Sequence, residues 1–226
     1  MTRFANPVWN PWENDRNTFD LYRRRCRREA EEMTCAAQAA QILAGLVLPG
    51  ETLLDVGCGG GYYYWSFHDR GVLVEYYGLD YTPLLIDLAR SELCPRAGLP
   101  SDRFMVGSIE DLDQSYDNIL CFNVLTNSPH YAAGLERLLL CARKRLLVRE
   151  SLGEELIVSY TPDPYLDEGK RHIRVYHNTY PIAEVTSFME SYGFAVTRIK
   201  DERTQDGNEM VVDIPHQWRI LLAERT

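Results

Sequence analysis

The sequence predicts a single α/β domain in which helices cover both faces of a doubly wound, mostly parallel β-sheet. Between residues 52 and 150, short apolar runs alternate with stretches of helical pattern, which is typical of repeated strand–helix–strand units. The runs are nearly continuous in apolar residues, as expected for strands that are buried on both faces. A glycine-rich segment directly follows the first run, where sheets of this kind place a ligand-binding turn.

Five apolar runs are predicted to form the parallel part of the sheet. They are TLLDV (residues 52–56), VLVEYYGLD (72–80), RFMVG (103–107), NILCFNV (118–124) and RLLVRE (145–150). Two helices, at about 18–28 and 31–46, are expected before the first strand. Between the strands, Thr82 and Pro83 are predicted as the N-cap and first position of a helix, and residues 134–144 are a second helix candidate.

The last third of the chain predicts a helix followed by two strands. Pro181 opens the helix, apolar residues follow at helical spacing, and Gly193 is the expected left-handed C-cap. The strand candidates FAVTRIK (194–200) and WRILLAE (218–224) are separated by a segment without helical pattern. Because a parallel crossover normally needs a helix, this pair is predicted to be antiparallel.

Composition and charge narrow the function classes. The 226 residues carry a formal net charge of −9, which argues against a nucleic-acid surface, since phosphate binding needs a basic footprint. The six cysteines form no CxxC pair, so neither a zinc site nor a disulfide framework is indicated, and Cys121 and Cys141 are expected in the core. No apolar signal core and no run of membrane-spanning length is found, so we expect a soluble, cytoplasmic protein in a reducing compartment.

The glycine-rich segment has the pattern D-x-G-x-G-x-G, from Asp55 to Gly61. The dinucleotide fingerprint G-x-G-x-x-G does not fit, because its third glycine would fall on Tyr62 or Tyr64. Glycine permits positive φ and lets a ligand approach the backbone. An acid directly before the loop would repel a pyrophosphate and would suit a ligand that carries positive charge. The sequence therefore disfavours a nicotinamide dehydrogenase.

A second acid indicates a nucleoside ligand. Asp80 ends the second apolar run, 25 positions after Asp55 (80 − 55). In doubly wound sheets an acid at this position reaches the ribose hydroxyls, and an ionised carboxylate makes the stronger hydrogen bonds.

Four segments together resemble the successive motifs of the class I S-adenosylmethionine-dependent methyltransferases. They are LLDVGCGGG, YYGLDYTPLLIDLAR, RFMVGSIEDL and YDNILCFNVLTN, which cover about residues 53–127, and the final helix and strand pair also resembles that family. The resemblance implies a Rossmann-like sheet of seven strands, six parallel and one antiparallel. It also implies S-adenosyl-L-methionine (SAM) as the cofactor and S-adenosyl-L-homocysteine (SAH) as the product.

The resemblance assigns roles at the cofactor. Asp55 would steady the loop and help to hold the methionine amino group, and Asp80 would bind the ribose hydroxyls, with Tyr81 beside the adenine. The backbone of Ile109 and the region of Glu110 would meet the adenine edge. The remaining implied cofactor residues are the loop glycines, lining the methionine and ribose, and a residue near the methyl-bearing sulfur: Gly57, Gly59, Gly61 and Asn123.

In the adenine motif many relatives have Asp where this chain has Ser108. The aromatic run at 62–65 is expected in the first turn of the next helix and mostly in the core. Tyr62 or Tyr63 is the candidate for a wall of the cofactor site, where an aromatic face attracts a sulfonium.

The reaction implied is direct displacement, in which an acceptor atom attacks the sulfonium methyl. The candidate catalytic residues are His130, after the fourth strand, and His177 and Tyr176, in the long segment before Pro181. His172 is a further candidate, and Tyr180 could stack on an aromatic substrate. The alternative for each histidine is a surface or structural role. Asp117 and Asn118 lie at the wrong end of the fourth strand for a metal site, and we predict no metal.

Two N-terminal features leave alternatives open. The arginines of RRRCRR, residues 23–28, either dock an anionic substrate or form i,i+4 pairs on a solvated helix: Arg25–Glu29, Arg27–Glu31 and Arg28–Glu32. Trp9 and Trp12 either cap the cofactor site or anchor the N-terminal segment.

We expect one domain with four parts: an N-terminal helical cap (1–48), a cofactor-binding core (49–150), an acceptor-side insertion or lid (151–180), and a terminal helix with a strand pair (181–226). The predicted function is methyl transfer to an oxygen or nitrogen of a small-molecule acceptor, by a monomer or homodimer that binds neither nucleic acid nor membrane. The alternatives are a protein or peptide methyltransferase and a non-catalytic cofactor-binding subunit.

Overall fold

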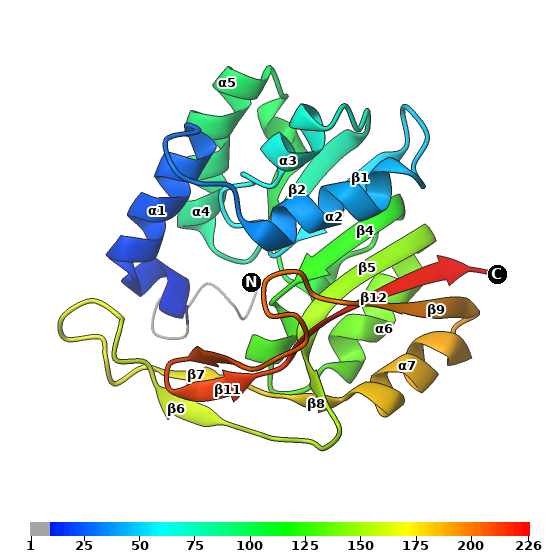
Figure 1. Cartoon of the computed structure of the whole chain (residues 1–226). Coiled ribbons are helices and arrows are strands. Elements are labelled where there is room, and N and C mark those ends of the chain that lie inside the picture. The colour runs from blue at the N-terminus through cyan, green and yellow to red at the C-terminus, as the bar shows by residue number, and fades with distance from the viewer. Residues whose placement is uncertain (1–9) are drawn as a thin grey trace.

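The structure, a computed structural model, describes residues 10–226 and contains one large mixed sheet (Figure 1). The strand order is β3-β2-β1-β4-β5-β12-β9, and the short β8 pairs with β5 as an eighth strand. All pairings are parallel except those of β12, which is antiparallel to both β5 and β9. The predicted α/β class and the antiparallel final strand pair are therefore confirmed.

The strands lie where the apolar runs predict them, with shifted ends. Their bounds are β1 Thr52–Val56, β2 Glu75–Asp80, β3 Phe104–Val106, β4 Tyr116–Phe122, β5 Ala142–Gly153, β8 Tyr180–Pro181, β9 Phe194–Ile199 and β12 Trp218–Arg225. The eighth strand is the main difference from the prediction. It arises because β5 continues three residues past the apolar run, so that Leu152 and Gly153 pair with Tyr180 and Pro181.

Helices cover both faces of this sheet, as predicted. Their bounds are α1 Arg16–Cys26, α2 Thr34–Ala44, α3 Tyr64–Asp69, α4 Pro83–Leu88, α5 Cys94–Ala97, α6 Ala132–Cys141 and α7 Ile182–Ser191. Successive residues of β1 show how the two faces are filled. Leu53 belongs to the apolar cluster shared with α2, α3 and α4, whereas Leu54 belongs to the cluster shared with α6 and α7. Both side chains are fully buried, as the period of two along a strand requires.

Two small hairpins form separate two-stranded sheets beside the large one. One pairs β6 (Tyr160–Pro162) with β7 (Arg174–Tyr176), and the other pairs β10 (Glu209–Val211) with β11 (Ile214–His216). In Figure 1 β6, β7 and β11 lie side by side, below α1. The first hairpin occupies the segment predicted as a lid.

The arginine-rich segment does not form the predicted i,i+4 pairs, and that expectation is wrong. Helix α1 ends at Cys26, whose thiol donates to the Gly60 carbonyl, and Arg28 takes a left-handed φ of +62°. The later arginines therefore leave the helix and reach other elements. Arg27 pairs with Glu92, with Nε 2.9 Å from Oε2, and Arg28 pairs with Asp69 at 2.5 Å.

All six cysteines are buried free thiols, and Cys121 and Cys141 lie in the core as predicted. Among residues 10–226, no helix is both long enough and apolar enough to cross a membrane.

Candidate functional site

The glycine loop after β1 lies against the carboxyl end of β2. The backbone N–H groups of Gly57 and Cys58 both donate to the Leu79 carbonyl, at 2.7 and 3.2 Å. Gly57, Gly59 and Gly61 all have positive φ. A Cβ on Gly61 would lie 2.4 Å from the Phe104 ring, so this position requires glycine for packing as well as for conformation.

Asp80 connects the glycine loop to the turn after β2. Its carboxylate is buried, and it accepts hydrogen bonds from the backbone N–H of Gly59 and of Thr82, each at 2.8 Å. Each oxygen of a carboxylate has two lone pairs, so both oxygens can accept one further hydrogen bond. The sequence-predicted residues at the ends of β1 and β2 are thus in direct contact.

Asp55 lies beneath the loop and is only 3% exposed. It accepts a hydrogen bond from the Tyr76 hydroxyl. Burial raises the pKa of Asp55 to about 7, with a further contribution from Asp80, although Tyr76 opposes the rise. Burial raises the pKa of Asp80 as well.

Neither Asp55 nor Asp80 forms an ion pair within residues 10–226. Two buried carboxylates without a cation suit a ligand that brings positive charge. This is the charge that the acid before the loop predicted. The sequence reasoning missed Tyr76, which is the register partner of Leu53 on β1 and therefore lies on the same face of the sheet.

Asp55→Asn is expected to stabilise the unliganded protein at neutral and higher pH. The ordinary pKa of the carboxyl is 3.8 and the folded pKa is about 7, so ionisation costs stability as the pH rises through this window. The gain from the neutral amide should grow between about pH 4 and pH 7 and then level off, at up to about 4 kcal/mol. Urea denaturation of both proteins at pH 5 and pH 8 measures it. A variant that is less stable than the wild type at both pH values would contradict this assignment.

The predicted adenine-side residues lie around Asp80 and the loop after β3. Tyr81 is half-buried and is hydrogen-bonded to Trp12. Ile109 is also half-buried and packs against the apolar cluster of α6, whereas Glu110 is exposed. Ser108 donates to Asp111 at 3.0 Å, so this hydroxyl has a partner within its own turn.

The N-terminal segment that begins at Asn10 contacts the predicted adenine side of the site. Asn10 donates to the Thr82 hydroxyl at 3.2 Å, and Trp12 packs against the cluster that contains Leu53. Trp12 therefore both anchors its segment and lies beside Tyr81. Trp9 lies outside the described residues.

The aromatic run packs mainly within the protein, as predicted, although helix α3 begins only at Tyr64. Tyr62 and Tyr63 lie in the preceding turn. Tyr62 packs on Tyr22 with ring centroids 5.0 Å apart, and Tyr63 is buried with its hydroxyl 3.0 Å from the Cys35 sulfur.

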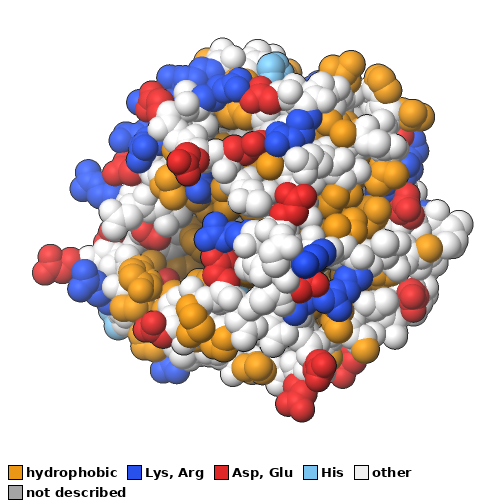
Figure 2. Space-filling model, viewed as in Figure 1, with side chains coloured by type: hydrophobic (Ala, Val, Ile, Leu, Met, Phe, Trp, Pro, Cys, Tyr) orange, Lys and Arg blue, Asp and Glu red, His pale blue; other side chains and the backbone are white. Residues whose placement is uncertain are grey.

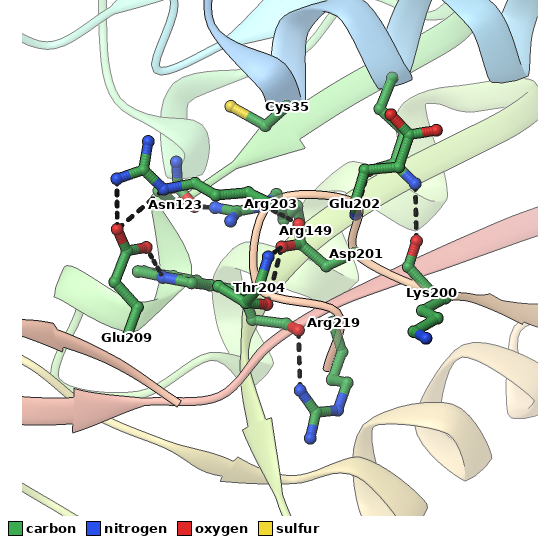
Figure 3. Close-up of polar contacts among 12 residues, drawn as sticks. Cys35, Asn123, Arg149, Lys200, Asp201, Glu202, Arg203, Thr204, Glu209 and Arg219 are labelled. Atoms are coloured by element: carbon green, nitrogen blue, oxygen red, sulfur yellow. Dashed lines mark hydrogen bonds and ion pairs between the residues drawn. The ribbon is translucent and has the colours of Figure 1, made fainter. Parts of the chain in front are cut away.

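The end of β4 is held by two adjacent charged residues of β5. Asn123 directly follows β4 with a φ of +59°, and its Oδ1 accepts a hydrogen bond from Arg149 Nη1 at 2.5 Å (Figure 3). The buried Glu150 accepts hydrogen bonds from the backbone N–H groups of residues 124, 125 and 126. The sequence analysis missed Arg149 and Glu150. Their signal was a charged pair at the end of an otherwise apolar strand.

Arg149 belongs to a buried polar cluster. Its Nε lies 2.6 Å from Asp201 Oδ2, and its guanidinium carbon lies 4.6 Å from the centre of the Trp218 ring. The His216 ring stacks on Trp218 at 4.8 Å with an interplanar angle of 3°, and the His177 ring lies 5.5 Å from His216. We call Arg149, His177, Asp201, His216 and Trp218 the β5–β12 cluster.

The three candidate catalytic residues lie in different environments. His130 is exposed on the loop after β4, whereas His177 is buried in the β5–β12 cluster. Tyr176 is half-buried and stacks on Tyr160 with centroids 4.3 Å apart. His172 is exposed.

Figure 2 shows the surface hollowed, with hydrophobic side chains on its floor, between the N-terminal helices and the hairpins.

Within residues 10–226, no group of three or more His, Cys, Asp or Glu side chains is placed to hold a metal ion. The Asp117 carboxylate instead accepts a hydrogen bond from the backbone N–H of Thr52, the first residue of β1. The side-chain amide of Asn118 donates a hydrogen bond to the Glu51 carboxylate, directly before β1.

Comparisons with known proteins agree with this architecture. A family model described as "Methyltransferase domain" matches residues 54–146. The chloroplastic magnesium protoporphyrin IX methyltransferase of Arabidopsis thaliana is 30% identical over 106 residues, which are 45% of this chain and 33% of that protein. The chain thus matches about one third of the length of that curated relative.

Two crystal structures show the same fold. Magnesium protoporphyrin IX methyltransferase from Synechocystis PCC 6803 with bound SAH has a TM-score of 0.61 and 21% identity, over 93% of this chain and 95% of that chain. The 1,6-didemethyltoxoflavin-N1-methyltransferase of Burkholderia thailandensis, with 1,6-didemethyltoxoflavin and SAH bound, has a TM-score of 0.58 and 17% identity. It covers 85% of this chain and 79% of that chain.

Proposed function

Since this chain carries a class I S-adenosylmethionine-dependent methyltransferase domain, we propose that it transfers the methyl group of SAM to an oxygen or nitrogen atom of a small-molecule acceptor. The observation that supports this most strongly is the common position of Asp55, Asp80 and Asn123. Asp55 is the second-last residue of β1, Asp80 is the last residue of β2, and Asn123 directly follows β4. These three strands are neighbours in the sheet, so the three residues lie together at the carboxyl ends of the parallel strands, beside the glycine loop. Ligands of doubly wound sheets bind at this edge.

The residues present fit a cationic nucleoside. The buried carboxylates of Asp55 and Asp80, which form no ion pair within residues 10–226, match its positive charge and its ribose hydroxyls, and the glycine loop leaves its backbone open to close approach. Bound SAM would supply a methyl group already activated by a sulfonium. We assign Asp80 to the ribose, Tyr81 and Ile109 to the adenine, and Asn123 to the neighbourhood of the methyl group.

The protein's own part in this reaction is alignment and the exclusion of water. Residues 151–180, with the β6–β7 hairpin, are our candidate for the acceptor-side lid, and they contribute His177 and Tyr176. The related structure with 1,6-didemethyltoxoflavin bound supports a small molecule as the acceptor class. The six free thiols support a reducing compartment, and we keep the cytoplasm as the proposed location.

Mass spectrometry of the chain incubated with SAM and a panel of phenols, carboxylic acids and amines tests the proposal. The expected result is a methylated product together with SAH, and no product from a protein in which Asp80 is replaced by alanine. SAM binding without any product would favour the non-catalytic cofactor-binding subunit. Absence of both binding and product would contradict the proposed function.

A further inference from the structure

The β5–β12 cluster contains four buried polar atoms that have no hydrogen-bond partner among residues 10–226. They are Arg149 Nη2, His177 Nε2, and both ring nitrogens of His216. The residues themselves are 2%, 5% and 1% exposed. Buried polar groups in folded proteins are nearly always paired, so a concentration of unpaired ones needs a specific explanation.

These four atoms belong to one contiguous group. Trp218 contacts both the Arg149 guanidinium and the His216 ring, and His216 in turn contacts His177. Arg149 comes from β5, His216 from β11, and His177 directly follows β7. The other terminal nitrogen of the guanidinium group, Arg149 Nη1, donates to Asn123 Oδ1, directly after β4.

The charge and the donor or acceptor character of the unpaired atoms determine which ligand groups could bind to them. The charge of Arg149 is balanced by Asp201, whose other oxygen accepts from the backbone N–H and hydroxyl of Thr204. Burial lowers the pKa of His177, and burial together with His177 and Arg149 lowers that of His216 to about 4, so both rings are neutral near pH 7. A neutral imidazole has one donor and one acceptor nitrogen, whereas Arg149 Nη2 only donates.

A ligand that complements this group must accept a hydrogen bond from Arg149. An oxygen of a carboxylate or a phenol does so, and a phenol can also give its proton to a neutral imidazole. A protonated amine would instead bring a second cation next to the guanidinium, which is unfavourable in a buried site.

We propose that the β5–β12 cluster binds the methyl acceptor through an oxygen atom, with Arg149 Nη2 and the His177–His216 pair as its partners, so that the protein is an O-methyltransferase for carboxylates or phenols. This inference rests on the proposed function and selects oxygen over nitrogen. The acceptor oxygen forms a new bond to the methyl carbon, and the electron pair of the broken carbon–sulfur bond stays on sulfur. A phenol proton passes to a histidine nitrogen and then to solvent, whereas a carboxylate has no proton to lose.

His216→Phe separates this role from a structural one. Neither nitrogen of His216 has a hydrogen-bond partner in the described part of the chain, so phenylalanine keeps the ring stacked on Trp218 and removes no hydrogen bond seen there. We expect an unchanged or higher melting temperature and an unchanged affinity for SAH. Affinity for the acceptor should fall by about tenfold or more, which is the value of one buried hydrogen bond. His68→Phe, at an exposed position of α3, is the matched control and should change neither affinity.

Benzoate, phenol and benzylamine, titrated separately into SAH-saturated protein, are the probes. The ring resonances of the five histidines are followed by NMR. We expect benzoate or phenol to shift the resonances of His177 and His216 but not those of His68, His130 and His172. A shift with benzoate alone identifies a carboxylate site, and a shift with phenol alone identifies a hydroxyl site.

The inference is overturned if neither oxygen probe shifts these two histidines, if benzylamine alone does so, or if His216→Phe binds the oxygen probes as tightly as the wild type. SAH binding is established first by calorimetry. Failure to bind SAH would contradict the proposed function, whereas SAH binding with no response of the two histidines contradicts only the present inference.

Discussion

Asp80→Ala is expected to weaken the binding of SAM by about 100-fold or more. The assigned partners of this carboxylate are the two ribose hydroxyls, and a hydrogen bond to a charged group contributes about 1.5–3 kcal/mol. Two such bonds correspond to at least about 3 kcal/mol, or about two orders of magnitude in the dissociation constant. The substitution also releases the Gly59 and Thr82 N–H groups that Asp80 now holds. Isothermal titration calorimetry with SAM and SAH measures the loss.

Two further variants make this result specific. Asp80→Asn keeps one carbonyl acceptor and should lose less affinity than the alanine variant. Asp87→Ala removes an exposed carboxylate seven residues further along the chain (87 − 80), and it should bind as the wild type does. Equal affinity of Asp80→Ala and the wild type would exclude the ribose assignment.

Arg149→Met is expected to lower the free energy of unfolding by about 3–5 kcal/mol. The Arg149–Asp201 pair is almost completely buried, with side chains 3% and 0% exposed, and removing one partner leaves an uncompensated buried charge. Burial alone would raise the pKa of Asp201, but Arg149 holds it below its ordinary value of 3.8. The pair therefore stabilises the fold above about pH 4, and this contribution is lost as the pH falls through the lower, folded pKa.

The double variant Arg149→Met/Asp201→Leu is the decisive comparison. It removes both charges together, and apolar replacement of a whole buried pair is often neutral or stabilising. Urea denaturation at pH 7 should show the double variant to be clearly more stable than Arg149→Met. A double variant no more stable than the single one, or a single variant within about 1 kcal/mol of the wild type, would contradict the dominance of this ion pair.

The sheet was predictable because its strands carry their burial pattern locally. Leu53 and Leu54 occupy opposite faces without reference to any distant residue. The ends of elements were less predictable, because tertiary contacts decide them. Helix α1 stops at Cys26, where the thiol binds Gly60 and the Cys26 carbonyl accepts a hydrogen bond from the Trp65 indole, so the predicted arginine–glutamate pairs could not form.

The residues of the candidate site also differ in how far the sequence alone predicts them. Asp55 and Asp80 follow from strand ends, which the sequence marks. Arg149 lies within an apolar run, and its partners become visible only when the register sets it opposite Phe122 on β4 and Ile220 on β12. His216 belongs to a segment with no helical pattern, and a hairpin brings it beside His177, 39 positions earlier (216 − 177).

Calorimetric titration of the wild-type chain with SAM and SAH tests the central claim most directly. The account predicts saturable binding of both ligands at one site per chain, with dissociation constants in the micromolar range. No heat of binding from either ligand at millimolar concentration would contradict the cofactor site, and with it the function assigned to the protein.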